Sequence, residues 1–234
     1  MQLKIYFNLI SLYLISCLLA FSSCKDKQEN QPEVVKKIEE KTKHPAESTK
    51  STKKTILCFG NSLTAGYGLD ETEAWPSLLQ FKLDSLDQPY TVVNAGLSGE
   101  TTSGGLNRIN WVLKQHVVIF ILELGANDML RGLAVQQTKT NLEAIIQAVR
   151  NKYPKAAIIM AGMLAPPNMG KSYENKFNKI FPDLSMKYQT SIIPFFLENV
   201  AGQKDLNLAD GKHPNQTGQK LVLENVWASL EPLL

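Results

Sequence analysis

The sequence is poor in the residue types that build disulfide frameworks and metal centres. Its 234 residues include three cysteines and three histidines, and these lack the spacing of metal ligands. Cys17 and Cys24 lie in the N-terminal region, which leaves Cys58 alone inside an apolar run, where core packing is its expected role. We therefore expect no disulfide framework, no metal ion and no cofactor.

The sequence also lacks an excess of positive charge that would attract nucleic acid. The chain carries a formal charge of +3, but residues 25–54 hold nine lysines against six acidic residues, and Lys4 adds one more. The rest of the chain has 15 basic and 16 acidic residues. A near-neutral domain without a basic stripe gives no electrostatic reason to bind nucleic acid, so no such partner is expected.

The N-terminus, residues 1–23, is predicted to be a signal peptide of the lipoprotein type. Lys4 precedes an uncharged run over residues 5–24, which is typical of a secretory signal. Cys24 closes this run and is followed at once by charged residues, so we predict lipid attachment there, in resemblance to bacterial lipoproteins. Cys17 and an uncleaved anchor helix are alternatives, because about 20 apolar residues can span a bilayer. In each case we expect the domain to be exported from the cytoplasm, and with lipid attachment at Cys24 we expect it to be lipid-anchored to a membrane in the periplasm or cell envelope.

Residues 24–54 are predicted to be a flexible tether, because they are rich in Lys, Glu, Gln, Ser and Thr and have few large apolar side chains. Over residues 55–234, short β-branched runs alternate with longer amphipathic runs, which indicates one α/β domain with a parallel sheet and crossover helices. The expected strands cover residues 55–59, 91–95, 117–122, 156–161 and 191–193. The expected helices cover residues 75–86, 102–115, 138–152, 171–188 and 216–230.

Polar clusters interrupt this pattern at residues 60–63, 97–101, 123–128 and 210–215. Ser62 is a candidate nucleophile, because loops at the carboxyl ends of parallel strands present side chains to a crevice. Of the three histidines, only His213 has a carboxylate close in sequence, Asp210, which could fix the tautomer that accepts the serine proton. Acyl transfer needs such a nucleophile, base and orienting group, together with donors for the oxyanion.

The clusters resemble the motifs of the SGNH hydrolases, also called the GDSL family, and within it the bacterial thioesterase, lysophospholipase and arylesterase group. The resemblance covers nearly all of residues 55–234 and includes GNSL, AWPSLL, ELGANDMLRG, PPNMG, IPFFLENVAG and DGKHPN. It implies a three-layer α/β/α, flavodoxin-like fold with five parallel strands in the order 2-1-3-4-5. It also implies Ser62 as nucleophile with the Asp210 and His213 pair. The implied oxyanion hole consists of Ser62, Gly99 and Asn127.

Two positions depart from the family pattern. Asn61 stands where the family name has aspartate, a change that spares the nucleophile but can alter the hydrogen bonds beneath it. Met129 stands where many relatives have glycine, and it could narrow the acyl groove. Together with the apolar loop over residues 163–169, this predicts substrate contacts for Met129, Leu164, Pro166 and Met169.

Other polar residues are expected to have structural roles. Glu123, at the end of an apolar strand, is predicted to be buried and bonded to loop N–H groups, since an unpaired buried carboxylate is costly. Asp128 and Arg131 are predicted to pair locally, and His116 is predicted to be structural or solvated. Thr64 stands where a Gly-x-Ser-x-Gly elbow would have its second glycine, which argues against an α/β-hydrolase fold.

The sequence thus predicts a monomeric serine esterase or thioesterase for small-molecule acyl substrates, namely aryl esters, lysophospholipids or acyl thioesters. Alternatives are a carbohydrate acetylesterase, an acyltransferase and, from another class, a lipoprotein that binds lipid or glycan without catalysis. The oxyanion residues have alternative roles too. Asn127 could cap the segment that follows it, and Gly99 could serve only a turn.

Overall fold

A computed structural model describes residues 53–234 of the chain. The predicted signal peptide, the lipid-attachment site Cys24, its alternative Cys17 and most of the predicted tether lie outside the described residues. Within residues 53–234, no helix has both the length and the apolar composition that crossing a membrane requires.

A five-stranded parallel sheet forms the centre of the domain, in the order β2-β1-β3-β4-β5. This confirms the fold and the strand order that the resemblance implied. The strands are β1 (Lys54–Gly60), β2 (Tyr90–Gly96), β3 (Ile119–Glu123), β4 (Ala157–Ala161) and β5 (Ser191–Ile193).

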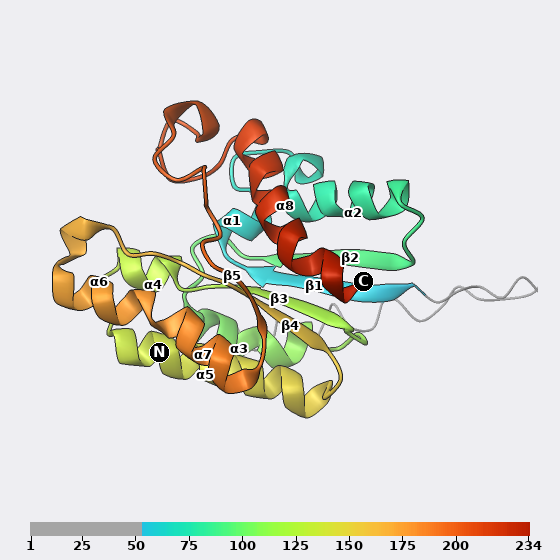
Figure 1. Ribbon diagram of the computed structural model, residues 1–234, viewed down its shortest axis with the longest axis horizontal. Coiled ribbons are helices and arrows are strands. Elements are labelled where there is room, and N and C mark those ends of the chain that lie inside the picture. The colour runs from blue at the N-terminus through green and yellow to red at the C-terminus, as the bar shows by residue number, and fades with distance from the viewer. Residues whose placement is uncertain (1–52) are drawn as a thin grey trace, which may run out of the picture. The chain divides into compact units, whose positions relative to one another are not determined.

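Helices cover both faces of the sheet (Figure 1). On one face lie α2 (Trp75–Ser85) and α8 (Gln216–Leu230), and on the other lie α3 (Thr102–Val112), α5 (Val135–Lys152) and α7 (Ile180–Tyr188). The shorter elements are α1 (Ser62–Ala65), α4 (Ala126–Leu130), α6 (Lys171–Asn178), η1 (Glu71–Glu73), η2 (Pro167–Met169), η3 (Lys204–Leu206) and η4 (Glu231–Leu233). The arrangement is the predicted three-layer α/β/α sandwich.

The single helix expected over residues 171–188 is instead two helices, α6 and α7, which meet at Lys179. Pro182 explains the break. It has no N–H to donate to the carbonyl of Asn178, four residues earlier, so α6 ends there, whereas the first turn of α7 tolerates a proline because its N–H groups lack helical partners. The helix expected from residue 138 begins earlier, at Val135, and the short helices α1 and α4 were not predicted.

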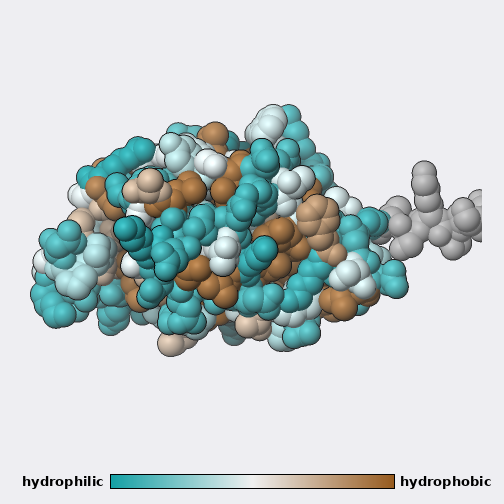
Figure 2. All heavy atoms as spheres, turned by 90° about the horizontal axis from the view of Figure 1, so that it is seen from above, coloured by the Kyte–Doolittle hydropathy of each residue, from teal (hydrophilic) through white to brown (hydrophobic). Residues whose placement is uncertain are grey.

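The core lies on both sides of the sheet. The four apolar side chains on the inner face of α5 are fully buried, namely Leu142, Ile145, Ile146 and Val149. Cys58 is also fully buried, and it is a free thiol, which confirms its role in packing. Seen from the side of α2 and α8, the surface is mainly hydrophilic, with separate hydrophobic patches (Figure 2).

The strand register brings the polar clusters together. Gly60, the last residue of β1, lies opposite Gly96 of β2 and Glu123 of β3, which are also the last residues of their strands. Three strands therefore end level with one another, so the loops that follow them meet at one edge of the sheet. The opposite edge holds the start of β1, where Lys54 lies opposite Tyr90, and the Tyr90 hydroxyl donates to the C-terminal residue Leu234.

Candidate active site

Ser62 lies at the start of α1, directly after β1. The Asn61 side chain accepts a hydrogen bond from the N–H of Leu63 at 2.9 Å and so caps this four-residue helix, which ends at Gly66 in the left-handed conformation. Gly60 leaves room for the turn, because a Cβ there would lie 2.5 Å from Oε2 of Glu123. The local sequence thus fixes Ser62 at the carboxyl edge of the sheet, with 7% of its surface exposed.

Ser62, His213 and Asp210 form a continuous chain of hydrogen bonds. Nε2 of His213 lies 2.8 Å from Oγ of Ser62, and Nδ1 lies 2.5 Å from Oδ2 of Asp210. The other carboxylate oxygen of Asp210 accepts from the backbone N–H groups of Lys212 and His213. The bond from the His213 ring, followed by that from the Lys212 N–H, lowers the pKa of Asp210 to about 2.

A charged Asp210 determines which ring nitrogen of His213 holds the proton. Because a carboxylate only accepts, Nδ1 carries the proton and donates it to Asp210, which leaves Nε2 free to accept from the Ser62 hydroxyl. The Tyr67 ring packs against the imidazole, with 4.5 Å between the ring centroids. The arrangement therefore contains a hydroxyl, an acceptor for its proton and a group that orients the acceptor.

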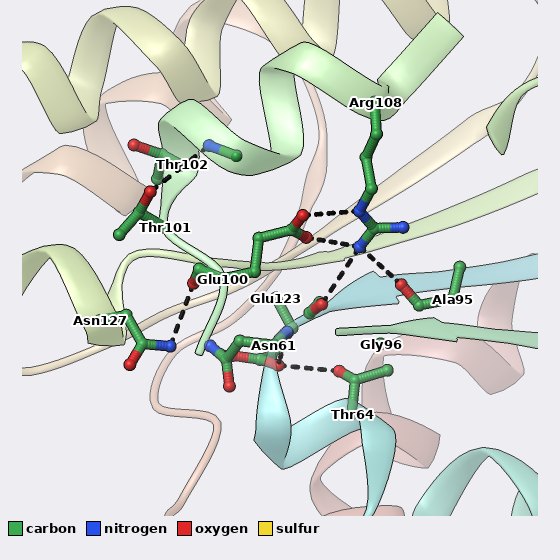
Figure 3. A network of polar contacts seen from close by, with 12 residues as sticks. Asn61, Thr64, Ala95, Gly96, Glu100, Thr101, Thr102, Arg108, Glu123 and Asn127 are labelled. Atoms are coloured by element: carbon green, nitrogen blue, oxygen red, sulfur yellow. Dashed lines mark hydrogen bonds and ion pairs between the residues drawn. The ribbon is translucent and has the colours of Figure 1, made fainter. Parts of the chain in front are cut away.

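Asn127 lies in α4, shortly after β3, and Gly99 lies in the loop after β2; both strands end level with β1, which precedes Ser62. The Asn127 side-chain amide donates to the carbonyl of Glu100 at 3.0 Å (Figure 3). The residue at the N-cap of α4 is Gly125, with a φ of 124°, so Asn127 does not cap the helix. Gly99 has a φ of 80°, a left-handed conformation that favours glycine.

Glu123 is fully buried directly beneath residues 61–64, the segment that carries Ser62. Its carboxylate accepts from the backbone and the side-chain amide of Asn61, at 3.0 and 2.7 Å, and from the hydroxyl of Thr64 at 2.8 Å. The prediction that Glu123 is buried and bonded to the loop is confirmed. Burial raises the pKa of Glu123 to about 8, although the bonds from Thr64 and Asn61 oppose this rise.

The predicted pairing of Asp128 with Arg131 is wrong. The Asp128 carboxylate accepts from the N–H and the hydroxyl of Thr102, at 2.8 and 2.5 Å, whereas the Arg131 guanidinium donates to the carbonyl of Gly99 at 2.7 Å. Asp128 thus bonds the first residue of α3 and Arg131 bonds the loop after β2, because β2 and β3 end level with one another on either side of β1. These two residues, close in sequence, therefore connect the segment after β3 to the segment after β2 and do not pair with each other.

The predicted substrate-contact residues have different surroundings. Met129 packs in the core, with 9% of its surface exposed, whereas Leu164 is 45% exposed and Pro166 is exposed. Met169 lines an open groove of about 980 Å³, between residues 132–139 and residues 169–183. Ser62 is not among the residues that line this groove.

His116 is exposed and packs edge-on against Tyr153, with 5.5 Å between the centroids, which agrees with the predicted structural or solvated role. Among residues 53–234, no group of three or more His, Cys, Asp or Glu side chains could hold a metal ion. The expectation of a metal-free site stays a prediction.

Sequence reasoning missed the ion pair between Arg108 and Glu100. The guanidinium donates to both carboxylate oxygens, at 2.6 and 2.5 Å, and to the carbonyl of Ala95 at 2.8 Å (Figure 3). The only signal in the sequence is a spacing of eight residues, about two helical turns, which is common on solvated helix faces. The contact between the rings of Tyr67 and His213 was also not predicted, because the two residues lie far apart in the sequence.

Residues 58–221 of the chain match the GDSL-like lipase/acylhydrolase family. The chain belongs to this family. Among family relatives, esterase TesA of Pseudomonas aeruginosa is 39% identical over 181 residues, covering 77% of this chain and 89% of that protein. The thioesterase 1/protease 1/lysophospholipase L1 of Escherichia coli K12 is 38% identical over 181 residues, covering 77% and 85%.

Solved structures of GDSL-type esterases share the fold. The crystal structure of TesA has a TM-score of 0.74 and 39% identity, covering 77% of this chain and all of that one. The psychrotrophic esterase EstA from Pseudoalteromonas sp., inhibited by monoethylphosphonate, has a TM-score of 0.72 and 35% identity, covering 76% and 97%. This chain is accordingly an ester hydrolase of the GDSL type.

Proposed function

We propose that this GDSL-type hydrolase cleaves acyl esters and thioesters through an acyl enzyme formed on Ser62. The observation that carries the proposal is the continuous hydrogen-bonded chain from Asp210 through His213 to the Ser62 hydroxyl. A module that only binds lipid or glycan has no need of a base aligned on a hydroxyl, so the geometry favours catalysis.

In the first half of the reaction, Oγ of Ser62 attacks the acyl carbon while Nε2 of His213 takes its proton. Asp210 stays charged and stabilises the imidazolium that forms. The carbonyl oxygen becomes an oxyanion, and we assign its donors to the backbone N–H groups of Ser62 and Gly99 and the side-chain amide of Asn127. The intermediate then collapses, and His213 returns the proton to the departing alcohol or thiol.

In the second half, water attacks the acyl-serine ester. His213 takes a proton from this water and returns it to Oγ of Ser62, so the acid is released and the enzyme is restored. The same oxyanion donors serve both halves, because each passes through a tetrahedral intermediate at the same carbon. No step needs a metal ion or a cofactor.

The substrates that we propose are aryl esters, lysophospholipids or acyl thioesters. The relatives' names support the same range, since one is an arylesterase from Vibrio mimicus, 38% identical over 176 residues. The apolar loop over residues 163–169 favours acyl chains over sugars, so a carbohydrate acetylesterase and an acyltransferase remain second candidates.

We further propose that the enzyme is exported and lipid-anchored through Cys24, and that it acts as a monomer. The uncharged run over residues 5–24 and the polar segment after it support export and a tether. An anchored enzyme of this kind would meet its substrates at the membrane surface.

The test is a series of nitrophenyl esters of rising chain length, assayed with the full chain and with Ser62→Ala. We expect turnover by the wild type, none by a folded Ser62→Ala protein, and labelling of the wild type alone by a serine-directed phosphonate. Ser85→Ala is a matched control, since the Ser85 hydroxyl only donates to the carbonyl of Lys82 at the end of α2. Full activity in Ser62→Ala would overturn the proposal.

A further inference from the structure

The Arg108 guanidinium lies at a junction of several parts of the site. It holds the Glu100 carboxylate by two bonds, donates to the carbonyl of Ala95 at the end of β2, and lies 4.2 Å above the ring of Phe59 in β1. A weaker bond of 3.4 Å reaches the carbonyl of Gly60. Arg108, in α3, thus contacts the end of β1, which precedes Ser62, and the end of β2, which precedes Gly99.

Glu100 is fixed at its side chain, its N–H and its carbonyl. Its side chain is only 3% exposed and is held by Arg108, and its N–H donates to the carbonyl of Leu97. Gly104 makes room for the side chain, since a Cβ there would lie 3.1 Å from Cγ of Glu100. Its carbonyl accepts from the Asn127 side chain at 3.0 Å. Glu100 therefore links Arg108 to the proposed oxyanion donor (Figure 3).

This link decides which way the Asn127 amide points. A backbone carbonyl can only accept, so the nitrogen of the side-chain amide, and not its oxygen, faces Glu100. One N–H is used there, and the second remains for an oxyanion. If the carbonyl of Glu100 moved, the amide could rotate and present its oxygen to the developing negative charge, which would be repelled.

We propose that Arg108 and Glu100 are positioning residues that hold the Asn127 amide in its donating orientation. This inference rests on the proposed function, because it assigns a task within the oxyanion hole. We assign neither side chain a contact with the substrate. The ion pair acts through the backbone of Glu100, and its effect on catalysis should therefore vanish when Asn127 has no amide to orient.

The experiment is a double-mutant cycle with Arg108→Lys and Asn127→Ala. Lysine keeps the positive charge near Glu100 but lacks the planar fork that bonds the carboxylate and Ala95 together. We expect Arg108→Lys to lower kcat about tenfold, with KM nearly unchanged, because a small misplacement of a donor is costly in the transition state. In the Asn127→Ala background, the same change should lower kcat less than about threefold. A further loss of about threefold or more would overturn the proposal.

Arg150→Lys is the matched control for a merely structural role. The Arg150 guanidinium also donates to a backbone carbonyl, that of Ala156 at 2.9 Å, but at the end of α5 and the start of β4, away from Ser62. We expect Arg150→Lys to change kcat in neither background. If Arg108→Lys does not fold, Glu100→Gln removes one charge from the pair while preserving its shape, and it should give the same pattern.

A second readout does not depend on turnover. The NMR signals of the Asn127 side-chain amide, assigned by their loss in Asn127→Ala, should shift in Arg108→Lys and stay in place in Arg150→Lys. Unchanged signals in Arg108→Lys would overturn the positioning role. Absence of ester hydrolysis by the wild type would instead refute the proposed function, while the amide signals would still test whether Arg108 orients Asn127.

Discussion

Replacing Glu123 by glutamine should change how the stability of the protein depends on pH. Burial raises the pKa of Glu123 from 4.5 to about 8, so between these values the folded chain holds a proton that the unfolded chain has released. Folding then takes up a proton, and stability falls as the pH rises. The stabilising contribution is complete below about pH 4.5 and is lost as the pH rises through about 8.

The size of this effect follows from the width of that interval. Each pH unit across it is worth about 1.4 kcal/mol, so the wild type should lose up to about 5 kcal/mol of unfolding free energy between pH 4.5 and pH 8. For a domain of this size, that is a fall of about 10–20 °C in melting temperature. Glutamine has no proton to release, so the curve of Glu123→Gln should lack this fall.

The two curves should therefore approach each other as the pH rises. At pH 5, Glu123→Gln should be less stable than the wild type, because its NH₂ group faces the Asn61 amide, and such a conflict costs about 1–3 kcal/mol. Toward pH 8 the gap should close or reverse. Thermal unfolding at pH 5, 6, 7 and 8 measures this, and Glu143→Gln serves as a control on the surface of α5. Parallel curves for Glu123→Gln and the wild type would refute the reasoning, since Glu123 would then be charged throughout.

Three further predictions concern the proposed site and the anchor. Asn127→Ala should lower kcat about 10²–10³-fold with KM nearly unchanged, whereas a lower melting temperature with normal kcat would indicate a structural role. His213→Ala should abolish turnover, because Nε2 of His213 contacts the Ser62 hydroxyl, and His116→Ala should leave turnover unchanged; loss of activity in His116→Ala but not in His213→Ala would contradict the assignment. Cys24→Ser should abolish incorporation of labelled lipid, and continued labelling would point to Cys17.

Much of the fold was predictable from periodicity, and part of the site from short spacings. The inner face of α5 follows from its apolar repeat, and the contact between Asp210 and His213 follows from their separation of three residues. The contact between Ser62 and His213 spans 151 residues, and no local pattern contains it. The sequence pointed to it only through the resemblance to a known family.

The missed features depend on single residues or on tertiary placement. Helix α1 is four residues long and is defined by its Asn61 cap, so no apolar repeat could indicate it. Arg108 has the spacing of a solvated helix residue, and its role depends on Phe59 and Ala95, which β1 and β2 bring beneath it. From the sequence alone, a long polar side chain such as that of Arg108 is therefore predicted to be solvated, even where tertiary contacts hold it in place.

Tyr90 lies opposite Lys54 and donates a hydrogen bond to Leu234. This arrangement has a practical consequence for immobilising the enzyme. The first strand of the described domain and the last residue of the chain share the edge of the sheet opposite the one that carries Ser62. A bead or a fusion partner attached behind Leu234 would therefore leave the proposed catalytic edge facing the solution. The same proximity makes the domain a candidate for circular permutation, with a short glycine-rich linker joining residue 234 to residue 53 and new ends placed in an exposed loop.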